Sequence, residues 1–255
     1  MYTSAWPING ILSPKDSTAL FEAIALRKSC RSFLSAPTTE QWNQLGTAAE
    51  RFRLPGARIA LGLCDTSLFQ PFLGLMMKFE NVQRYAAIIA TDNDPRGTVN
   101  AGASGELLLL QAVSMGLAGV WVSGTFKRQK VNVKLADGER LLALIALGVP
   151  AEPPQLVTAR ERKPLTAYYE NDFSTAPIVV REMMVAVQAA PSAMNKQPWR
   201  TRYEPEGVLV LRVKSPALAG GLDLGIATVH AMLALGSTPA MFSISEDGAA
   251  VSVTL

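Results

Sequence analysis

Four side chains that can bind an anion lie within five residues in the segment RKSCRSF, residues 27–33. Each of the two arginines can grip phosphate oxygens through a two-pronged guanidinium, the lysine adds charge, and a serine hydroxyl donates a further hydrogen bond. Since the segment follows a predicted helix, whose C-terminal end repels anions, these side chains must supply all of the attraction. The pattern predicts a site for a phosphate dianion, and a solvated basic helix end is an equally good interpretation of this segment alone.

A second polar cluster lies in APSAMNKQPW, residues 190–199, where two prolines bracket Ser192, Asn195 and Gln197. A rigid turn that carries polar groups and ends in tryptophan suits the edge of a heteroaromatic ligand, which needs donors in its ring plane and apolar cover on its face. A turn that begins a strand would give the same pattern, so the segment alone is compatible with both interpretations.

A third basic segment, RERKPL at residues 160–165, contains Arg160 and Arg162. Residues two apart point to the same side of an extended chain, so in that conformation both guanidiniums would reach one phosphate. Taken alone, the segment is more typical of a surface linker.

The composition excludes several classes of protein and site. Two cysteines and one histidine among 255 residues are too few for a disulfide framework or for a zinc site with several protein ligands. The net charge of +3 is spread over short clusters, which suit a small anion better than a nucleic acid. The N-terminal segment has no signal-peptide pattern, and polar residues and glycines interrupt the apolar run of residues 107–122. We therefore expect a cytoplasmic protein without a metal, a membrane span or a nucleic-acid partner.

The elements that position these motifs follow from capping signals and hydrophobic periodicity. A serine cap followed by proline and an acid predicts a helix from Ser13 to near Ser29, and Thr38 followed by Gln41 predicts a second helix start. The other elements predicted in this part are a helix at residues 103–115 and strands at residues 59–64, 86–90, 120–123 and 141–149. A proline-rich stretch at residues 150–164 then forms a connection.

A second series of helices and strands begins after about Thr175. The elements predicted there are helices at residues 181–190 and 222–235 and strands at residues 208–213, 241–245 and 251–255. The glycine-helix-glycine layout of GLDLGIATVHAMLALG resembles that of AGASGELLLLQAVSMGLAG, which makes a weak internal repeat of pattern without identity. Helices and strands are mixed in both parts, so we predict an α+β fold with a sheet flanked by helices, divided into residues 1–172 and 173–255.

Together, the three motifs resemble those of the FMN-dependent nitroreductase family. RKSCRSF is similar to that family's Arg-x-Ser-x-Arg signature, and APSAMNKQPW is similar to its Pro-Ser-x-x-Asn-x-Gln-Pro-Trp loop. ALGVPAEPP leading to RERKPL resembles the family's closing strand and arginine segment. The resemblance implies a nitroreductase-like α+β fold, rich in antiparallel strands, that binds FMN as its cofactor.

The resemblance also implies a set of cofactor-binding residues. The phosphate of FMN would be held by Arg27, Lys28, Ser29, Arg160 and Arg162. Arg31 would lie near N1 and the C2 carbonyl of the flavin, where a guanidinium stabilises the negative charge of the reduced ring. The ribityl chain and ring would be contacted by Pro191, Ser192, Ala193 and Asn195, and from another side by Ser123, Gly124 and Thr125. No side chain would serve as a catalytic group, because the flavin carries the chemistry.

The chain departs from the family pattern in the spacing of its motifs. Ordinary members have the Pro-Ser loop a few tens of residues after the arginine motif, whereas Pro191 lies far beyond Arg31 and AAERFRLPG, residues 48–56, stands where the loop is expected. In ordinary homodimers the partner's loop completes each site, so this chain resembles a divergent branch in which two family-like halves are fused. The expectation is a monomer that acts as a pseudo-dimer.

By the same resemblance, the activity would be electron transfer from NADH or NADPH, bound transiently, through FMN to a quinone, a nitroaromatic or a similar small acceptor. A flavin-binding protein for storage or sensing, without turnover, is the alternative, since the second half has lost site residues. A structural protein that binds no flavin is a second alternative, because a fold does not fix a function.

Two titratable residues remain in the second part. His230 lies in IATVHAML on an inward helix face, where a lone histidine is more often a hydrogen-bonded core residue than a catalyst. Asp223, in GLDLG, is interpreted as a helix cap in preference to a base.

Overall fold

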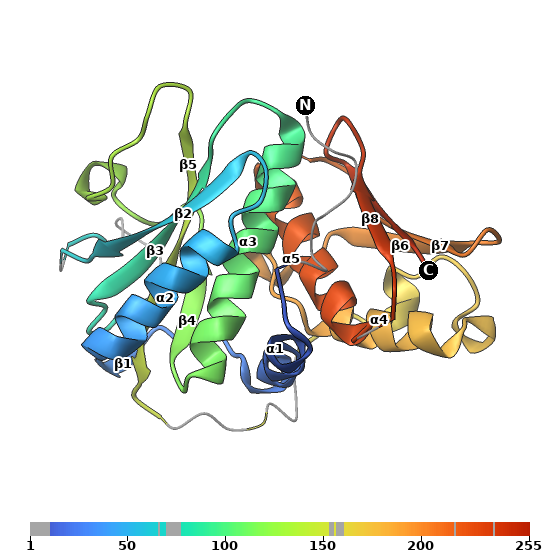
Figure 1. Cartoon of the computed structure of the whole chain (residues 1–255), viewed down its shortest axis with the longest axis horizontal. Helices are drawn as coiled ribbons and strands as arrows, with labels where there is room; N and C mark the ends of the chain where they lie inside the picture. The colour runs from blue at the N-terminus through green and yellow to red at the C-terminus, as the bar shows by residue number, and fades with distance from the viewer. Residues whose placement is uncertain are drawn as a thin grey trace.

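Two antiparallel sheets lie on either side of a central pair of helices (Figure 1). The arrangement is that of a computed structural model, which describes residues 11–65, 67–69, 78–152, 156, 161–216, 218–236 and 238–255. The helices are α1 (Pro14–Leu26), α2 (Thr39–Arg51), α3 (Pro95–Ser114), α4 (Ile178–Ala189) and α5 (Leu218–Ala234). The strands are β1 (Phe33–Ser35), β2 (Ala57–Leu63), β3 (Arg84–Ala90), β4 (Ala118–Val122), β5 (Arg140–Pro150), β6 (Trp199–Glu204), β7 (Val208–Val213), β8 (Met241–Ile244) and β9 (Ala250–Thr254).

The first sheet has the strand order β1-β5-β3-β2, and β4 also pairs with β5. All of these pairings are antiparallel, with Ile59 opposite Ile88 in β2 and β3, and Ala87 opposite Leu144 in β3 and β5. Strands β3 and β5 are buried along most of their length, which explains why they are continuous apolar runs in the sequence. Helix α3 packs against this sheet, and α2 packs against β2 and α3.

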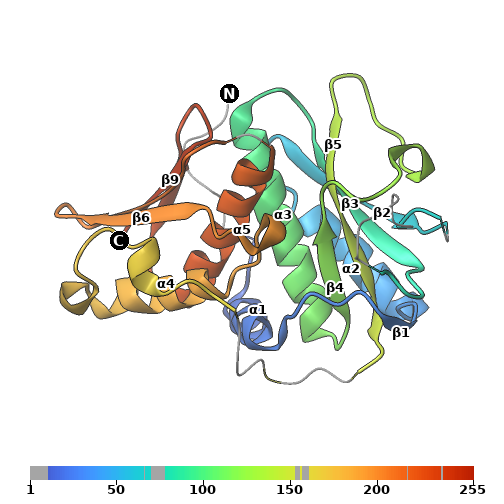
Figure 2. The same ribbon diagram turned by 180° about the vertical axis from the view of Figure 1, so that it is seen from behind.

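The second sheet has the order β6-β7-β9-β8 and is also antiparallel, with Leu211 of β7 opposite Val251 of β9. Buried and exposed residues alternate along β6, so one face of this sheet is directed to the core. Helix α5 packs on the sheet and α4 packs on α5, as seen from behind in Figure 2. Each sheet therefore has its own long buried helix.

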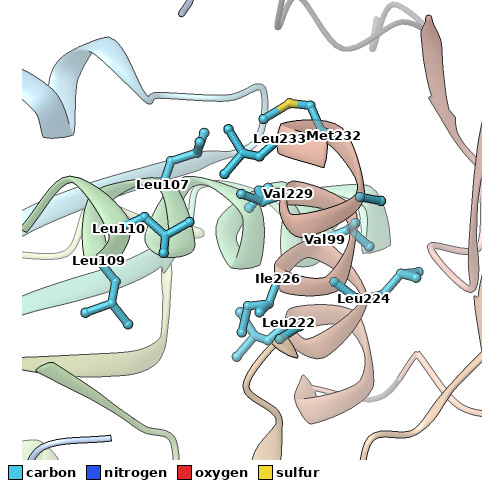
Figure 3. Packing of buried hydrophobic residues seen from close by; sticks show 14 of the residues in the cluster. Val99, Leu107, Leu109, Leu110, Leu222, Leu224, Ile226, Val229, Met232 and Leu233 are labelled. Atoms are coloured by element: carbon cyan, nitrogen blue, oxygen red, sulfur yellow. The ribbon is translucent and has the colours of Figure 1, made fainter. Parts of the chain in front are cut away.

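Helices α3 and α5 join the two sheets through a close contact. Figure 3 shows apolar side chains of both helices, from Val99 on α3 to Val229 on α5, packed where the helices meet. A Cβ atom at Gly225 would lie 1.9 Å from the carbonyl oxygen of Val99, and one at Gly102 would lie 2.3 Å from that of Leu222. Glycine is required at both positions because the two backbones approach too closely for any side chain.

Gly225→Ala is expected to destabilise the protein, because the added methyl group would force α3 and α5 apart. Overpacking of this kind lowers the free energy of unfolding by about 1–3 kcal/mol. Gly46→Ala in α2 is the matched control, since a Cβ there would meet only Leu61, at an ordinary 3.9 Å. Urea denaturation measures both variants, and equal stability of the two would contradict the close helix contact.

Helices α4 and α5 begin at Ile178 and Leu218, a few residues before the predicted starts at 181 and 222. Two further helix boundaries differ from those predicted, and packing explains both. Helix α1 ends at Leu26 instead of near Ser29, because the chain leaves the helix at Arg27 and the N–H of Cys30 donates to a carbonyl of β4. Helix α3 begins at Pro95 instead of residue 103, although its first turns are rich in glycine, which disfavours helices. The contact with α5 needs Gly102, so tertiary packing overrides the local preference there.

The predicted α+β class, rich in antiparallel strands and flanked by helices, is confirmed, but the structure has two antiparallel sheets where one was predicted. The predicted start of α2 is also confirmed, because Thr38 and Gln41 form reciprocal side-chain to backbone hydrogen bonds. Strands β1 and β6 were not predicted as separate elements. Within the described ranges, no helix is long and apolar enough to cross a membrane.

Candidate functional site

Two arginines from distant parts of the chain meet at the C-terminal end of α4. Arg27, the residue after α1, donates from Nη2 to the carbonyl oxygen of Ala189 at 3.1 Å. Arg162, in the segment between β5 and α4, donates from Nη2 to the same oxygen at 3.3 Å. The last carbonyl groups of a helix lack intrahelical partners and carry the negative end of its dipole, so they attract guanidiniums. The end of α4 therefore brings together two of the predicted phosphate-binding residues.

Arg27 is buried, Arg162 is half-buried, and the two guanidiniums repel each other. Arg27 is 2% exposed, and burial lowers its pKa, while the nearby carboxylate of Glu106 acts to raise it. Burial also lowers the pKa of Arg162, and the charge of Arg27 lowers it further. Among the described residues, Arg162 donates only to uncharged oxygens, which are those of Glu161, Gln188, Ala189 and Asn195. An anion would stabilise a site with this excess of positive charge.

The Pro-Ser loop is joined directly to this pair. The side-chain oxygen of Asn195 accepts a hydrogen bond from Nη1 of Arg162 at 2.8 Å. The side-chain nitrogen of Asn195 donates to the carbonyl oxygen of Glu161 at 3.0 Å. Because Pro191 follows the last turn of α4 almost at once, the helix end that gathers the arginines also sets the position of the loop.

The backbone of this loop is strained. Met194, Asn195 and Gln197 have φ angles of 52°, 54° and 46°, in the left-handed region that residues other than glycine seldom adopt. The N–H of Gln197 donates to Oγ of Ser192 at 2.8 Å, and its side chain donates to the carbonyl oxygen of Asn195 at 3.1 Å. Strain of this kind persists only where surrounding contacts hold it, and it is concentrated at ligand clamps and active sites. The loop is therefore a candidate for contact with a ligand.

A buried carboxylate that was not predicted as a site residue lies against this loop. Asp223 is 4% exposed, and its Oδ1 accepts the N–H of Ala193 at 3.0 Å. Its interpretation as a helix cap is wrong, because α5 begins earlier, at Leu218. Burial raises the pKa of Asp223 to about 7, and the hydrogen bond from Ala193 opposes this only in part. An acid between two leucines in GLDLG was the signal of a buried carboxyl group.

Asp223 should make the stability of the protein depend on pH. Its pKa in the folded state, about 7, lies above its ordinary value of 3.8, so the folded state holds this proton more tightly than the unfolded state. Ionisation of this carboxyl group is less favourable in the folded protein than in the unfolded chain. The free energy of unfolding should therefore fall, by roughly 2–3 kcal/mol, as pH rises from 4 to about 7. Asp223→Asn should abolish this fall in pH-dependent urea denaturation. The exposed control Glu246→Gln should retain it, and a flat wild-type profile would contradict the assignment.

The rest of the RKSCR motif runs beside β4. Ser29 forms a parallel bridge with Gly119, and the N–H of Cys30 donates to the carbonyl oxygen of Gly119 at 3.1 Å. The Lys28 side chain is exposed and pairs with Glu152 at 3.5 Å, so surface charge already offsets it. Lys28 is therefore a weaker candidate for an anion contact than Arg27.

Arg31 is half-buried and lies just before β1. Its Nε atom is buried without a hydrogen-bond partner among the described residues. A buried donor of this kind is available to a ligand, because such groups are almost always paired in the native state. Arg160 lies outside the described residues.

Ser123, Gly124 and Thr125 follow β4 directly. Gly124 is exposed, and a Cβ atom added to it would meet no atom within 4 Å. In the described part of the chain these three residues are not bonded to Arg162 or Asn195. The structure therefore leaves open space at the end of β4 but does not join this segment to the arginine pair.

His230 is a buried, hydrogen-bonded core residue, as predicted. It is completely buried, and each of its ring nitrogens lies within hydrogen-bond distance of an oxygen atom. One of these oxygens belongs to Glu106, which was not predicted as a site residue. A lone acid in the apolar helix AGASGELLLL was the available signal, because a buried carboxylate requires partners.

Comparisons with known structures identify the fold. A protein from Thermotoga maritima described as a "putative nitroreductase" has a similar structure over 92% of this chain and 93% of that chain, with 22% sequence identity and a TM-score of 0.63. A nitroreductase family protein from Clostridium difficile 630 matches 58% of this chain and 94% of that chain, at 16% identity and a TM-score of 0.44. No curated protein matches this chain. The Thermotoga structure shows that the two chains share a fold.

The family itself is shown by the sequence. A sequence model of the family described as "Putative TM nitroreductase" matches residues 19–235, which is most of the chain. This range contains Arg27, Arg162 and Asn195, so the matched region includes the whole cluster at the end of α4. The resemblance predicted from the three motifs is thereby confirmed. The chain belongs to this nitroreductase family and is an oxidoreductase.

Proposed function

We propose that the protein uses FMN to pass electrons from NADH or NADPH to a quinone, a nitroaromatic or a similar small acceptor. Its family already places it among the oxidoreductases. We propose FMN as its cofactor, NADH or NADPH as its electron donor, and a small quinone-like or nitroaromatic molecule as its acceptor. The observation that carries it is the meeting of Arg27 and Arg162 at one carbonyl oxygen, beside the strained loop that contains Asn195.

The donor set at the end of α4 fits the phosphate of FMN. A single carbonyl oxygen carries only a partial negative charge, whereas two guanidiniums donate to it. A phosphate dianion would balance both cations and can accept from each guanidinium through two oxygens. We assign the phosphate to Arg27 and Arg162, with Lys28, Ser29 and Arg160 as further members of the two motifs. The donor set also favours an anion over a neutral ligand, since a neutral ligand would give Arg162 no opposite charge.

The remaining predicted residues would bind the rest of the cofactor. The ribityl chain and ring would contact Pro191, Ser192, Ala193 and Asn195, and Ser123, Gly124 and Thr125 would approach the ring from another side. Arg31 would lie near N1 of the ring, which would give its unpaired Nε a partner. When bound, FMN supplies the redox chemistry, so the side chains need only bind, orient and stabilise charge.

We also propose that residues 1–172 and 173–255 are two fused halves that share one cofactor site. Each part contains its own antiparallel sheet and its own long buried helix, α3 or α5. The arginines come from the first part and the Pro-Ser loop from the second, and the bond between Arg162 and Asn195 joins them. In this proposal the contact between α3 and α5 takes the place of a contact between two subunits.

The absorption spectrum of the purified protein tests the cofactor and its redox competence together. We expect a flavin spectrum after FMN is added and excess is removed, and bleaching by NADPH or NADH in the absence of oxygen. Steady-state oxidation of either donor with an added quinone or nitroaromatic then tests turnover. A yellow protein inert to both donors would favour storage or sensing, and a colourless protein that takes up no FMN would overturn the proposal.

Arg31→Met should change the redox potential of the bound flavin more than its affinity. The proposed partner of Arg31 gains negative charge only on reduction, so loss of the guanidinium should lower the midpoint potential and leave binding of oxidised FMN nearly unchanged. Equilibration with reference dyes measures the potential, and fluorescence titration measures affinity. If the potential is unchanged, Arg31 does not lie at the ring.

A further inference from the structure

Behind the proposed phosphate site, Arg27 is joined to a buried network that reaches three other elements. Its Nε lies 3.7 Å from Oε1 of Glu106 on α3, and that oxygen lies 2.9 Å from Nε2 of His230 on α5. Nδ1 of His230 lies 3.0 Å from the carbonyl oxygen of Ala186 on α4. Nε1 of Trp121, on β4, donates to the other oxygen of Glu106 at 2.8 Å. Arg27, Glu106 and His230 are each at most 2% exposed.

The hydrogen bonds of His230 fix where its protons lie. A backbone carbonyl oxygen only accepts hydrogen bonds, so the nitrogen facing Ala186 must carry a proton. A neutral imidazole then presents a lone pair to Glu106, and a lone pair and a carboxylate oxygen 2.9 Å apart repel each other. The contact therefore requires one more proton, on either the imidazole or the carboxyl group. With that proton the Glu106–His230 pair is neutral overall, and without it the pair carries one negative charge.

We infer that binding of phosphate beside Arg27 is coupled to retention of this proton by the Glu106–His230 pair. The inference rests on the proposed function, because it assigns the phosphate of FMN to the guanidinium that also faces Glu106. A phosphate dianion and a negatively charged pair would lie on opposite sides of a single arginine and compete for its charge. Anion binding thus favours the neutral pair, and by reciprocity the neutral pair favours anion binding.

The surroundings of the pair leave few other groups to balance this charge. Burial lowers the pKa of His230, and the hydrogen bond and charge of Glu106 act to raise it. Burial acts to raise the pKa of Glu106, but His230 and Arg27 hold it below its usual value. From the elements packed against the pair, the facing groups in the described residues are Arg27, the Ala186 carbonyl and the Trp121 indole. Arg27 is the one permanent charge among them. An anion bound to Arg27 therefore weakens the stabilisation that this arginine gives to the negatively charged pair.

Nuclear magnetic resonance of the imidazole tests the coupling directly. The chain has one histidine, so labelled histidine gives a single set of signals that needs no assignment. We expect His230 to titrate at a pH about one unit higher in the FMN complex than in the complex with riboflavin, which lacks the phosphate. Inorganic phosphate added to the riboflavin complex should move the titration in the same direction.

The reciprocal measurement is the affinity for FMN as a function of pH. Phosphate groups themselves lose a proton near pH 6, so the wild type is compared with His230→Gln, which lacks the titrating ring. The measured quantity is the ratio of the affinity for FMN to the affinity for riboflavin. As pH falls through the titration of His230, this ratio should rise up to about tenfold more in the wild type than in the variant. Trp121→Phe is the control, because it removes a hydrogen bond to Glu106 without removing a titrating group.

The outcomes separate this inference from the proposed function. If FMN does not bind, the proposed function fails and the coupling fails with it. If FMN binds, but His230 gives the same signals and the same titration in the FMN and riboflavin complexes, only the coupling is overturned. The magnetic resonance experiment uses the wild-type protein, so it decides the question even if His230→Gln does not fold.

Discussion

Arg27→Ala and Arg162→Ala are each expected to weaken FMN binding by about 1.5–3 kcal/mol, or roughly 10- to 150-fold, because each removes a charge-assisted contact to the phosphate. The double variant should lose FMN during gel filtration. Both guanidiniums donate to the carbonyl oxygen of Ala189, so either one alone would leave the dianion with half of its counter-charge. Fluorescence titration of each variant gives the dissociation constants.

Riboflavin distinguishes a phosphate contact from general damage to the fold. Loss of Arg27 leaves Glu106 buried beside one fewer cation, which weakens every ligand if the site distorts. Loss of a phosphate contact lowers the affinity for FMN and leaves that for riboflavin nearly unchanged. Arg202→Ala is the matched control, because that arginine is exposed and pairs with Glu204 on its own strand. If both site variants retain FMN as the wild type does, the phosphate lies elsewhere.

One FMN per chain, bound by a monomer, is the second expected result. The first part of the chain contributes Arg27 and Arg162, and the second contributes Asn195, so one complete set of donors exists. A symmetry-related site would need arginines from REMMVAVQ and a loop from AAERFRLPG, and neither segment has the required donors. Burial of a phosphate without paired cations would cost several kcal/mol. A second site should therefore be empty at any practical FMN concentration.

Stoichiometry and mass measured on the same sample test this expectation. Flavin released by denaturation is compared with protein concentration, and light scattering gives the mass of the species that carries the flavin. Two FMN per chain would contradict the proposal of fused halves. The same conclusion would follow if FMN were lost whenever a dimer is diluted to monomers, because a partner chain would then complete the site.

Much of the chemistry of the site could be predicted from the sequence. The arginines of RKSCR, the polar residues of the Pro-Ser loop and the capping pair Thr38 and Gln41 act over a few residues, so residue type and spacing are enough to identify them. The apolar runs of β3 and β5 likewise indicate burial without knowledge of the fold. These features predicted both the α+β class and the family.

The tertiary structure decided which of these groups meet. Arg27 and Ala189 are 162 residues apart, and Glu106 and His230 are 124 residues apart. Such pairs depend on how sheets and helices pack, which local patterns do not encode. The glycine-rich start of α3 and the buried position of Asp223 also depend on packing. Helix propensity disfavours the first, and the capping pattern had placed Asp223 at the start of a helix.

One physical reason separates what the sequence predicts from what the tertiary structure decides. A side chain carries its charge, its hydrogen-bonding groups and its local backbone preference wherever it lies, so the sequence by itself determined that this protein has arginine clusters able to bind an anion and a polar loop bracketed by prolines. Burial and proximity are properties of the folded chain. Only folding withdrew Arg27 from solvent, placed Arg162 beside it at the end of α4, and set Glu106 and His230 behind it, where a shared proton can respond to charge.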